Sequence, residues 1–145
     1  KGFVTTFYTA CPEPFPNTFT SNQYSDASWL CWYALHKNYD GYLRWAYNCW
    51  NENPLTDSRF GLWPGGDTYF VYPGGRSSIR FERLREGIQD FEKFKILRAQ
   101  FQKSGKLNEV KQLDDVLKDF ELENLNGTNS NIALEKARHI LNSFE

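Results

Sequence analysis

The chain has 145 residues, of which 40% are hydrophobic and 24% are charged, a length and composition compatible with one globular domain. Its net charge of −1 argues against a nucleic-acid or anionic-membrane partner, because such partners usually require a basic surface. No apolar run reaches the roughly 18 residues that cross a bilayer, so no membrane insertion is expected.

The first part of the chain predicts a strand and a long loop. Residues 2–10, GFVTTFYTA, alternate aromatic or β-branched residues with small ones, as strands do. Residues 11–20, CPEPFPNTFT, contain three prolines, which interrupt helices and sheet ladders alike. The chain has no Met and opens directly in strand-like sequence, so we expect residue 1 to lie inside a longer protein whose missing N-terminal part is a partner of this segment.

A helix and two more strands are expected next. Residues 25–36 place rings and leucines at helical spacing, and Ser25 or Asp26 is suited to cap this helix. The further elements predicted in this part are a strand over residues 41–50, a long loop over residues 51–67 and a third strand over residues 68–75.

Beyond residue 76 the sequence predicts helices. Of the 25 aromatic residues, 19 lie in residues 1–72, whereas 25 of the 35 charged residues lie beyond them. Apolar residues recur there at helical spacing against the charged background. We expect one helix from Ser77 or Ser78 to about Gln102, a second over about 110–120, and a third from Asn131 onward. The expected division is a barrel part, residues 1–103, and a C-terminal helical extension packed on it, residues 104–145.

The order of elements indicates an α/β fold. Strands that alternate with helices pair in parallel through right-handed crossovers. The loops after the strands are long, which is typical of barrels whose active site lies at the carboxyl ends of the strands. Three strands are too few for a closed barrel of about 250 residues. We therefore expect the C-terminal part of a (β/α)8 TIM-type barrel, with about three parallel strands, crossover helices and C-terminal helices. Open strand edges would favour self-association of the segment.

Four long motifs resemble a known family: GFVTTFYTACPEPFPNTFT, DGYLRWAYNCWNENPLTDSRF, WPGGDTYFVYPGG and SSIRFERLREGIQDFEK. Over about residues 2–100 the chain resembles the C-terminal part of the glycoside hydrolase family 123-like catalytic domain, formerly a domain of unknown function and common in Bacteroides-type bacteria. The resemblance implies a (β/α)8-type barrel that hydrolyses β-linked N-acetylgalactosamine, with a glycan as the partner and no cofactor. It also implies a periplasmic or cell-surface location in a bacterium, which the sequence itself does not indicate.

The mechanism that the resemblance implies uses the substrate's own acetamide, whose oxygen attacks the anomeric carbon. In the family an adjacent Asp–Glu pair assists: the Asp orients the acetamide and the Glu protonates the leaving oxygen. This sequence contains no Asp-Glu step, and its acidic pairs Asp114–Asp115 and Glu121–Glu123 lie on charged helix faces. The family's pair lies on an earlier strand, so no catalytic residue is assigned here and the segment alone is expected to be inactive. The alternative is a non-catalytic carbohydrate-binding barrel fragment.

The stretch GYLRWAYNCW predicts one wall of a sugar pocket. Side chains alternate along a strand, so Arg44, Asn48 and Trp50 share one face. Rings cover the apolar face of a pyranose, while guanidinium and amide groups bind its hydroxyls. Arg44 suits either a structural ion pair or a ligand contact, whereas Asn48 and Trp50 are expected to touch the sugar. The other face is expected to meet covering helices; it carries Leu43, Trp45, Tyr47 and Cys49.

Further polar and aromatic residues lie where strands end or loops begin. By the resemblance, Tyr8 donates to the acetamide oxygen, or else it packs as a ring. Asn51 binds hydroxyls or shapes a turn, and Trp63 is a sugar platform or a plug on the rim. Tyr72 precedes glycines that let backbone approach a ligand closely. The predicted substrate-binding residues are Tyr8, Arg44, Asn48, Trp50, Asn51, Trp63 and Tyr72.

Metal and phosphate sites are not expected. The three cysteines form no CxxC pair and the two histidines supply no close ligand pair, so free thiols are favoured over one disulfide. The stretch PGGRSS precedes a helix but lacks the spacing of a P-loop. Arg76 and Arg80 are therefore expected to form ion pairs on the rim.

Overall fold

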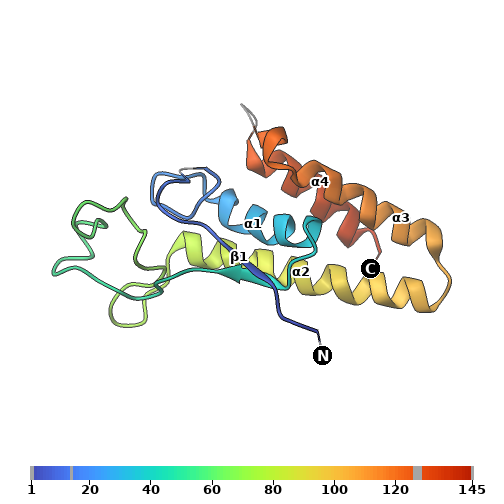
Figure 1. Ribbon diagram of the computed structural model, residues 1–145, viewed down its shortest axis with the longest axis horizontal. Coiled ribbons are helices and arrows are strands. Elements are labelled where there is room, and N and C mark those ends of the chain that lie inside the picture. The colour runs from blue at the N-terminus through green and yellow to red at the C-terminus, as the bar shows by residue number, and fades with distance from the viewer. Residues whose placement is uncertain (1, 14, 126–128, 145) are drawn as a thin grey trace.

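The computed structural model describes residues 2–13, 15–125 and 129–144, whose arrangement Figure 1 shows. The long helix α2 runs along the molecule with α1 beside it; α3 lies along the C-terminal part of α2, and α4 packs against both α1 and α2. The chain between β2 and α2 projects as loops beyond the other end. The elements are β1 (Thr6–Tyr8), α1 (Ser25–His36), β2 (Gly41–Leu43), α2 (Ile79–Lys103), α3 (Leu107–Val116), the 3-10 helices η1 (Leu117–Phe120) and η2 (Leu122–Leu125), and α4 (Ser130–Asn142).

The helices bury their rings in one shared core. Trp32 of α1 stacks on Phe120 of η1, with ring centroids 5.2 Å apart, and meets Phe94 of α2 edge-on at 6.0 Å. Trp29, also on α1, lies 5.8 Å from Phe120. Large rings dominate such a core because each removes a wide apolar area from water. Residues on both sides of residue 103 contribute to this core. Those after residue 103 include Leu113, Val116, Leu125, Leu134, Ala137 and Leu141.

Helices α1 and α2 approach each other closely at a glycine. A Cβ atom built on Gly87 would lie 2.8 Å from the Cα atom and 3.0 Å from the carbonyl oxygen of Ser28. The Ser28 hydroxyl donates to the carbonyl oxygen of Arg83 at 2.5 Å. One position on α2 therefore has to lack a side chain for this contact to form.

The helix ends agree with the sequence except at α1. Ser78 caps α2 as predicted, because its hydroxyl accepts a hydrogen bond from the Phe81 amide at 3.1 Å. The N-cap of α1 is Tyr24, so the predicted cap by Ser25 or Asp26 is wrong. Asp26 instead turns inward and accepts a hydrogen bond from Ser130 at 2.8 Å. None of the helices in the described ranges is both long and apolar enough to cross a membrane.

Strands β1 and β2 form a two-stranded parallel sheet joined through α1. This confirms the parallel pairing of the first two predicted strands, although each is shorter than predicted. The Thr5 amide donates to the Asp40 carboxylate at 2.7 Å, which ties the starts of the two strands together. The register pairs Thr6 with Gly41, Phe7 with Tyr42 and Tyr8 with Leu43.

The third predicted strand is not a parallel strand, so that prediction is wrong. Residues 68–72 run back beside residues 47–49, and Asn48 and Tyr69 form an isolated antiparallel bridge. The Phe70 amide donates to the Tyr47 carbonyl oxygen at 2.8 Å. Residues 51–67, all of them described, contain no helix. A parallel crossover needs a long, usually helical connection, whereas an antiparallel return needs only a loop.

The face predicted to meet covering helices is mostly open. Leu43 and Trp45 are 55% and 46% exposed, and Cys49 is exposed as well. Tyr47 is half-exposed but turns one edge toward Phe81 of α2, with ring centroids 5.6 Å apart. The prediction fails for Leu43 because Tyr42, on the other face of β2, is the residue that packs against the helical core. It fails for Trp45 and Cys49 because β2 ends at residue 43 and strict alternation ends with it.

Candidate functional site

Arg44, the residue after β2, ties three segments of the chain together. Its Nη1 donates to the carbonyl oxygen of Thr9 at 2.9 Å and to Oδ1 of Asn17 at 3.3 Å. Its Nη2 donates to the carbonyl and carboxylate oxygens of Asp67, each at 2.6 Å. Thr9 follows β1, Asn17 lies in the proline-rich loop and Asp67 ends the long loop. One guanidinium group therefore joins the ends of both strands to the base of the long loop.

The Arg44–Asp67 ion pair is buried, with side chains 6% and 1% exposed. The sequence left Arg44 open between an ion pair and a ligand contact. The structure shows the ion pair, and the ligand contact stays a prediction. The Tyr42 hydroxyl lies 2.6 Å from the Thr9 hydroxyl and belongs to the same network. Burial raises the pKa of Tyr42, so this hydroxyl stays protonated and able to donate.

Arg80 holds the other side of the loop base, and the prediction that it forms an ion pair on the rim is wrong. It is 3% exposed and donates to the carbonyl oxygens of Thr18, Gly66 and Tyr69 at 2.7, 2.8 and 2.9 Å. Burial lowers its pKa. A Cβ atom built on Gly66 would lie 2.7 Å from the guanidinium carbon. The arginine is drawn inward because backbone carbonyl groups that the loop buries need donors.

Above this polar base, aromatic rings face solvent. Trp45 directly follows Arg44, and its ring centroid lies 4.7 Å from that of Trp63, with the ring planes 43° apart. The two residues are 46% and 43% exposed. Trp63 therefore lies at the surface as predicted for a platform or a rim plug. Trp45 was missed, because strand alternation assigned it to the opposite face.

Three other predicted residues lie on neighbouring segments. Asn48 is exposed, and its backbone pairs with that of Tyr69. The indole nitrogen of Trp50 donates to the Val71 carbonyl oxygen at 2.7 Å, and 36% of the residue remains exposed. Tyr72 packs edge-on against Tyr69 at 5.2 Å. The antiparallel return thus brings Asn48 and Trp50 beside the segment of residues 69–72, which ends in Tyr72.

A shallow cleft of about 400 Å³ opens beside Trp50. It combines two rings with an amide and a carboxylate, which is the mixture that suits a carbohydrate. Phe60 is a residue of this cleft that the sequence did not single out. The lining residues are Trp50, Asn51, Glu52, Phe60 and Gly61.

Asn51 holds the loop around this cleft in shape. Its amide nitrogen donates to the carbonyl oxygens of Asp57 and Arg59 at 2.8 and 2.6 Å. Its Oδ1 accepts a hydrogen bond from the Asn53 amide at 3.0 Å. The turn-shaping role that the sequence allowed is therefore present, and contact with a hydroxyl group stays a prediction.

An adjoining hollow of about 520 Å³ carries the charges of the loop. Asp57 and Arg59 form an exposed ion pair at 2.9 Å. Hydrogen bonds from Arg59 lower the pKa of Asp57 to about 2, so this carboxylate stays ionised at neutral pH. Glu52 lines both the cleft and the hollow, and it is the carboxylate beside Trp50.

Tyr8 is the last residue of β1 and is 51% exposed. Its neighbour Thr9 reaches the Arg44 network, which places Tyr8 at the same carboxyl end of the sheet as the loop base. About half of the residue is open to solvent, and contact with a ligand stays a prediction.

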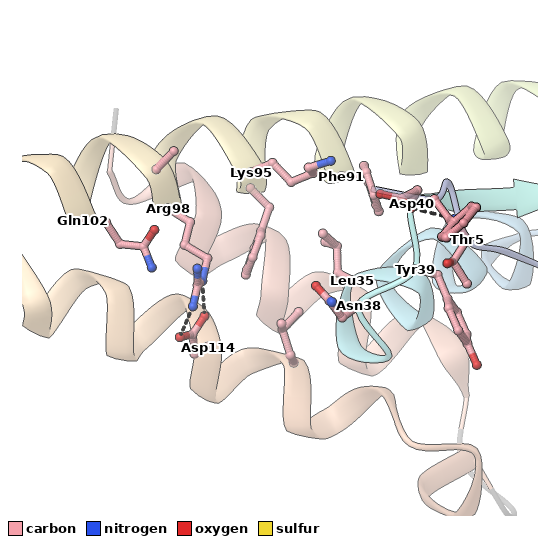
Figure 2. A pocket seen from close by; sticks show the side chains of 14 residues that line it. Thr5, Leu35, Asn38, Tyr39, Asp40, Phe91, Lys95, Arg98, Gln102 and Asp114 are labelled. Carbon is pink, nitrogen blue, oxygen red and sulfur yellow. Dashed lines mark hydrogen bonds and ion pairs between the residues drawn. The ribbon is translucent and has the colours of Figure 1, made fainter. Parts of the chain in front are cut away.

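A larger space of about 570 Å³ lies at the opposite end of the strands. Thr5 and Asp40, which precede β1 and β2, line it together with residues of α2 and α3 (Figure 2). Its guanidinium group, on Arg98, is already paired with the carboxylate of Asp114 at 2.7 and 3.0 Å. None of the predicted substrate-binding residues lines this space.

The described residues contain no group of three or more histidine, cysteine or acidic side chains placed to hold a metal ion. Cys11, Cys31 and Cys49 are free, as the sequence favoured, with Cys31 buried and the other two exposed. Burial raises the pKa of the Cys31 thiol to about 12, so it stays protonated and inert.

Comparisons with known proteins agree on one enzyme family. A family model described as "Glycoside hydrolase 123, catalytic domain" matches residues 1–97. Seven chains of solved structures match significantly. One, from a study of glycolipid glycan hydrolysis, is a family 123 glycoside hydrolase from Clostridium perfringens, similar to this chain with a TM-score of 0.72 and 26% identity. The match covers 94% of this chain and 26% of that one, so the chain spans about a quarter of that enzyme. No curated protein sequence matches significantly.

Proposed function

The chain belongs to the glycoside hydrolase 123 catalytic-domain family, and on that premise we propose that it is part of a glycosidase acting on β-linked N-acetylgalactosamine. The match of residues 1–97 to the catalytic domain carries this proposal. The exposed rings and the cleft beside Trp50 support it, because flat rings and amides suit a pyranose.

The proposed architecture is the C-terminal part of a (β/α)8 barrel. The parallel pair of β1 and β2, joined through α1, is one unit of such a barrel. The loops after β1 and β2 meet at Arg44, at the carboxyl ends of the strands, where barrel enzymes keep their active sites. The antiparallel return of residues 68–72 would then be an elaboration of the loop that follows β2.

In the proposed reaction this chain binds and orients the sugar. Trp50 and Phe60 would cover an apolar sugar face, while Asn48, Asn51 and Tyr72 would bind polar groups around it. Tyr8 would donate to the substrate's acetamide oxygen, which attacks the anomeric carbon. Arg44 would act through the loop base that it holds. The acid pair that assists the acetamide would come from another part of the full-length protein, because these 145 residues contain no Asp-Glu step.

The test is hydrolysis of an aryl β-N-acetylgalactosaminide by the full-length protein. Release of the aryl alcohol is expected, and Trp50→Ala should raise KM because it removes a ring from the cleft. Tyr24→Ala serves as a control, since Tyr24 is 53% exposed and lies outside the cleft. Absence of hydrolysis by a full-length protein that carries an Asp–Glu pair would contradict the proposed substrate.

A second candidate is a non-catalytic carbohydrate-binding barrel, which needs no Asp–Glu pair anywhere in the full-length protein. This candidate uses the same rings and amides, so binding alone does not separate the two. Titration of N-acetylgalactosamine against tryptophan fluorescence would detect binding, and the aryl-glycoside assay would detect turnover. Saturable binding of the sugar by the full-length protein without turnover would assign it to the second candidate.

A further inference from the structure

Arg80, the second residue of α2, carries its charge where both the helix and the protein interior disfavour a cation. It is 3% exposed and lies at the N-terminal end of a 25-residue helix, where the helix dipole is positive. In the described part of the chain its hydrogen bonds go to carbonyl oxygens rather than to a carboxylate, although burial of a charge costs free energy. A neutral donor would satisfy a carbonyl group without that cost. What the guanidinium group adds is a rigid plane that holds several acceptors at fixed positions.

The carbonyl groups that Arg80 holds belong to three different segments. Its Nη1 donates to the carbonyl oxygen of Thr18 in the proline-rich loop at 2.7 Å and to that of Gly66 in the long loop at 2.8 Å. Its Nη2 donates to the carbonyl oxygen of Tyr69 in the antiparallel return at 2.9 Å. Gly66 has a φ of 76°, and a Cβ atom built on it would lie 2.7 Å from the guanidinium carbon, so the long loop rests directly on Arg80. One rigid group therefore fixes three segments relative to one another.

One of these segments supports the tryptophan of the cleft. The backbone of Tyr69 pairs with that of Asn48, two residues before Trp50. Two residues after Tyr69, the Val71 carbonyl oxygen accepts the hydrogen bond from the Trp50 indole nitrogen at 2.7 Å. The side chain of Trp50 is thus anchored to the segment that Arg80 holds at Tyr69.

Another of these segments is tied to the end of β1. The Thr18 amide donates to Oδ1 of Asn17 at 2.8 Å, and the side-chain nitrogen of Asn17 donates to the Ala10 carbonyl oxygen at 2.9 Å. The Thr9 hydroxyl donates to the same Oδ1 at 3.3 Å. Thr9 and Ala10 directly follow Tyr8 in the chain, so the hold on the Thr18 carbonyl group reaches the residues next to Tyr8.

We propose that Arg80 is a positioning residue of the sugar site, which sets the place of Tyr8 relative to Trp50 and its cleft. This inference rests on the proposed function, in which Tyr8 donates to the acetamide oxygen while Trp50 covers the sugar ring. Arg80 is buried and acts through the backbone carbonyl groups that it holds, without touching the sugar. A reaction whose nucleophile belongs to the bound sugar depends on the alignment of the two parts of the site. A displacement of about 1 Å costs up to roughly a hundredfold in rate.

Loss of this alignment should lower kcat rather than raise KM. The cleft is lined by residues 50–52, 60 and 61, and the hydrogen bonds of Asn51 shape this part of the loop without Arg80. The sugar ring should therefore still bind, whereas the acetamide is no longer held in its reactive position. A group needed only for the fold would change the amount of folded protein and leave kcat and KM of the folded enzyme as they are.

The experiment compares kcat and KM of the full-length protein and its variants on an aryl β-N-acetylgalactosaminide. Arg80→Lys keeps the charge, but one ammonium nitrogen cannot take the places of both Nη1 and Nη2. It should lower kcat roughly a hundredfold and change KM little. Gly66→Ala crowds the guanidinium group from the other side and should give the same pattern with Arg80 intact. Arg98→Lys is the matched control and should leave both constants unchanged, because Arg98 lies on the same helix and pairs with Asp114 away from the cleft.

Each other outcome overturns the proposal. Parent values of kcat in Arg80→Lys and Gly66→Ala, a rise in KM with kcat unchanged, or an equal loss of kcat in Arg98→Lys would each do so. Circular dichroism checks that the variants are folded; if Arg80→Lys is not, Gly66→Ala decides, and failure of both to fold would assign Arg80 to the fold alone. A parent protein that does not hydrolyse the glycoside contradicts the proposed function and this inference with it. Hydrolysis that Arg80→Lys leaves unaffected contradicts this inference alone.

Discussion

The helical region consists of α1, α2, α3, η1, η2 and α4, and the loop region of residues 44–76. The two regions bury and expose aromatic residues and arginines in opposite ways. In the helical region the rings of Trp29, Trp32 and Phe120 are at most 1% exposed. In the loop region Trp45 and Trp63 are almost half exposed, while the side chain of an arginine, Arg44, is buried. Arg80, at the start of α2, is buried against the same loops.

This difference shows two ways to stabilise a chain. Ring packing removes apolar area from water, but the buried rings can then make no contact outside the core. In the loop region, backbone carbonyl groups are drawn around the donors of Arg44 and Arg80 instead. Each guanidinium group offers five donors in a fixed plane, so one side chain can hold several segments. Rings of the loop region such as Trp45 and Trp63 thereby stay partly exposed to solvent.

The largest effect is expected from removing a ring of the helical core. Phe120→Ala should lower the free energy of unfolding by about 3–5 kcal/mol, because it leaves a cavity against Trp29 and Trp32. Trp63→Ala should cost less than half as much, since much of that ring is already in water. Urea denaturation followed by circular dichroism measures both. Equal losses would break the contrast between the two regions.

Removal of Arg44 should cost nearly as much. Arg44→Met leaves the Asp67 carboxylate buried without its partner, which should lower the free energy of unfolding by about 3–5 kcal/mol. The matched control is Arg59→Met, which removes the arginine of an exposed pair in the same region and should change stability little. A loss in Arg44→Met no larger than in Arg59→Met would show that the buried arginine does not hold the loop base.

A smaller loss is expected at the contact between α1 and α2. Gly87→Ala places a Cβ atom 2.8 Å from the backbone of Ser28, and overpacking of this kind costs about 1–3 kcal/mol. The better helix propensity of alanine returns about 1 kcal/mol, so a modest net destabilisation is expected. Thermal unfolding measures it. A higher melting temperature in Gly87→Ala would mean that the helices can move apart without loss.

Two carboxylates should give opposite dependences on pH. Burial raises the pKa of Asp26 above its unfolded value of about 4. The folded chain is therefore most stable with Asp26 protonated, and it loses this stability as pH rises from about 4 through the raised pKa. Hydrogen bonds from Arg59 lower the pKa of Asp57 to about 2, so its contribution is present above about pH 4 and is lost as pH falls toward 2.

Asparagine variants measure these two signs. Between pH 3 and 7, Asp26→Asn should gain stability relative to the parent chain as pH rises, and it can still accept the hydrogen bond from Ser130. Asp57→Asn should lose stability relative to the parent chain over the same range. Urea denaturation at a series of pH values gives both differences. Slopes of the same sign would contradict the environments described for the two carboxylates.

The sequence predicted the helices well because their signals are local. Apolar residues at helical spacing and the cap at Ser78 lie within a few residues of the structure that they specify. The strand pairing of β1 with β2 followed from the helix between them. The direction of residues 68–72 was predicted wrongly, because strand-like composition does not say whether a strand pairs in parallel or antiparallel. The connection of residues 51–67 contains no helix, and residues 68–72 run antiparallel to residues 47–49.

The candidate site was predicted only where a residue and its sequence signal lie close together in the chain. Trp63 and Trp50 were predicted to lie at the site because each tryptophan stands beside Gly, Pro or Asn in the sequence. Both are partly exposed. Trp45 was missed because its exposure depends on where β2 ends. Phe60 was missed because a lone phenylalanine in a loop carries no signal until the turn places it at the cleft.

By itself the sequence determined the helices, the parallel pair of strands and the family, all of which depend on patterns within short or continuous stretches. Only the tertiary structure decided which polar groups are buried together. Arg44 meets a carboxylate 23 residues away, and Arg80 meets a carbonyl group 62 residues away. Such contacts form because burial takes donors and acceptors away from water, and no local pattern encodes which partners the folded chain brings to them.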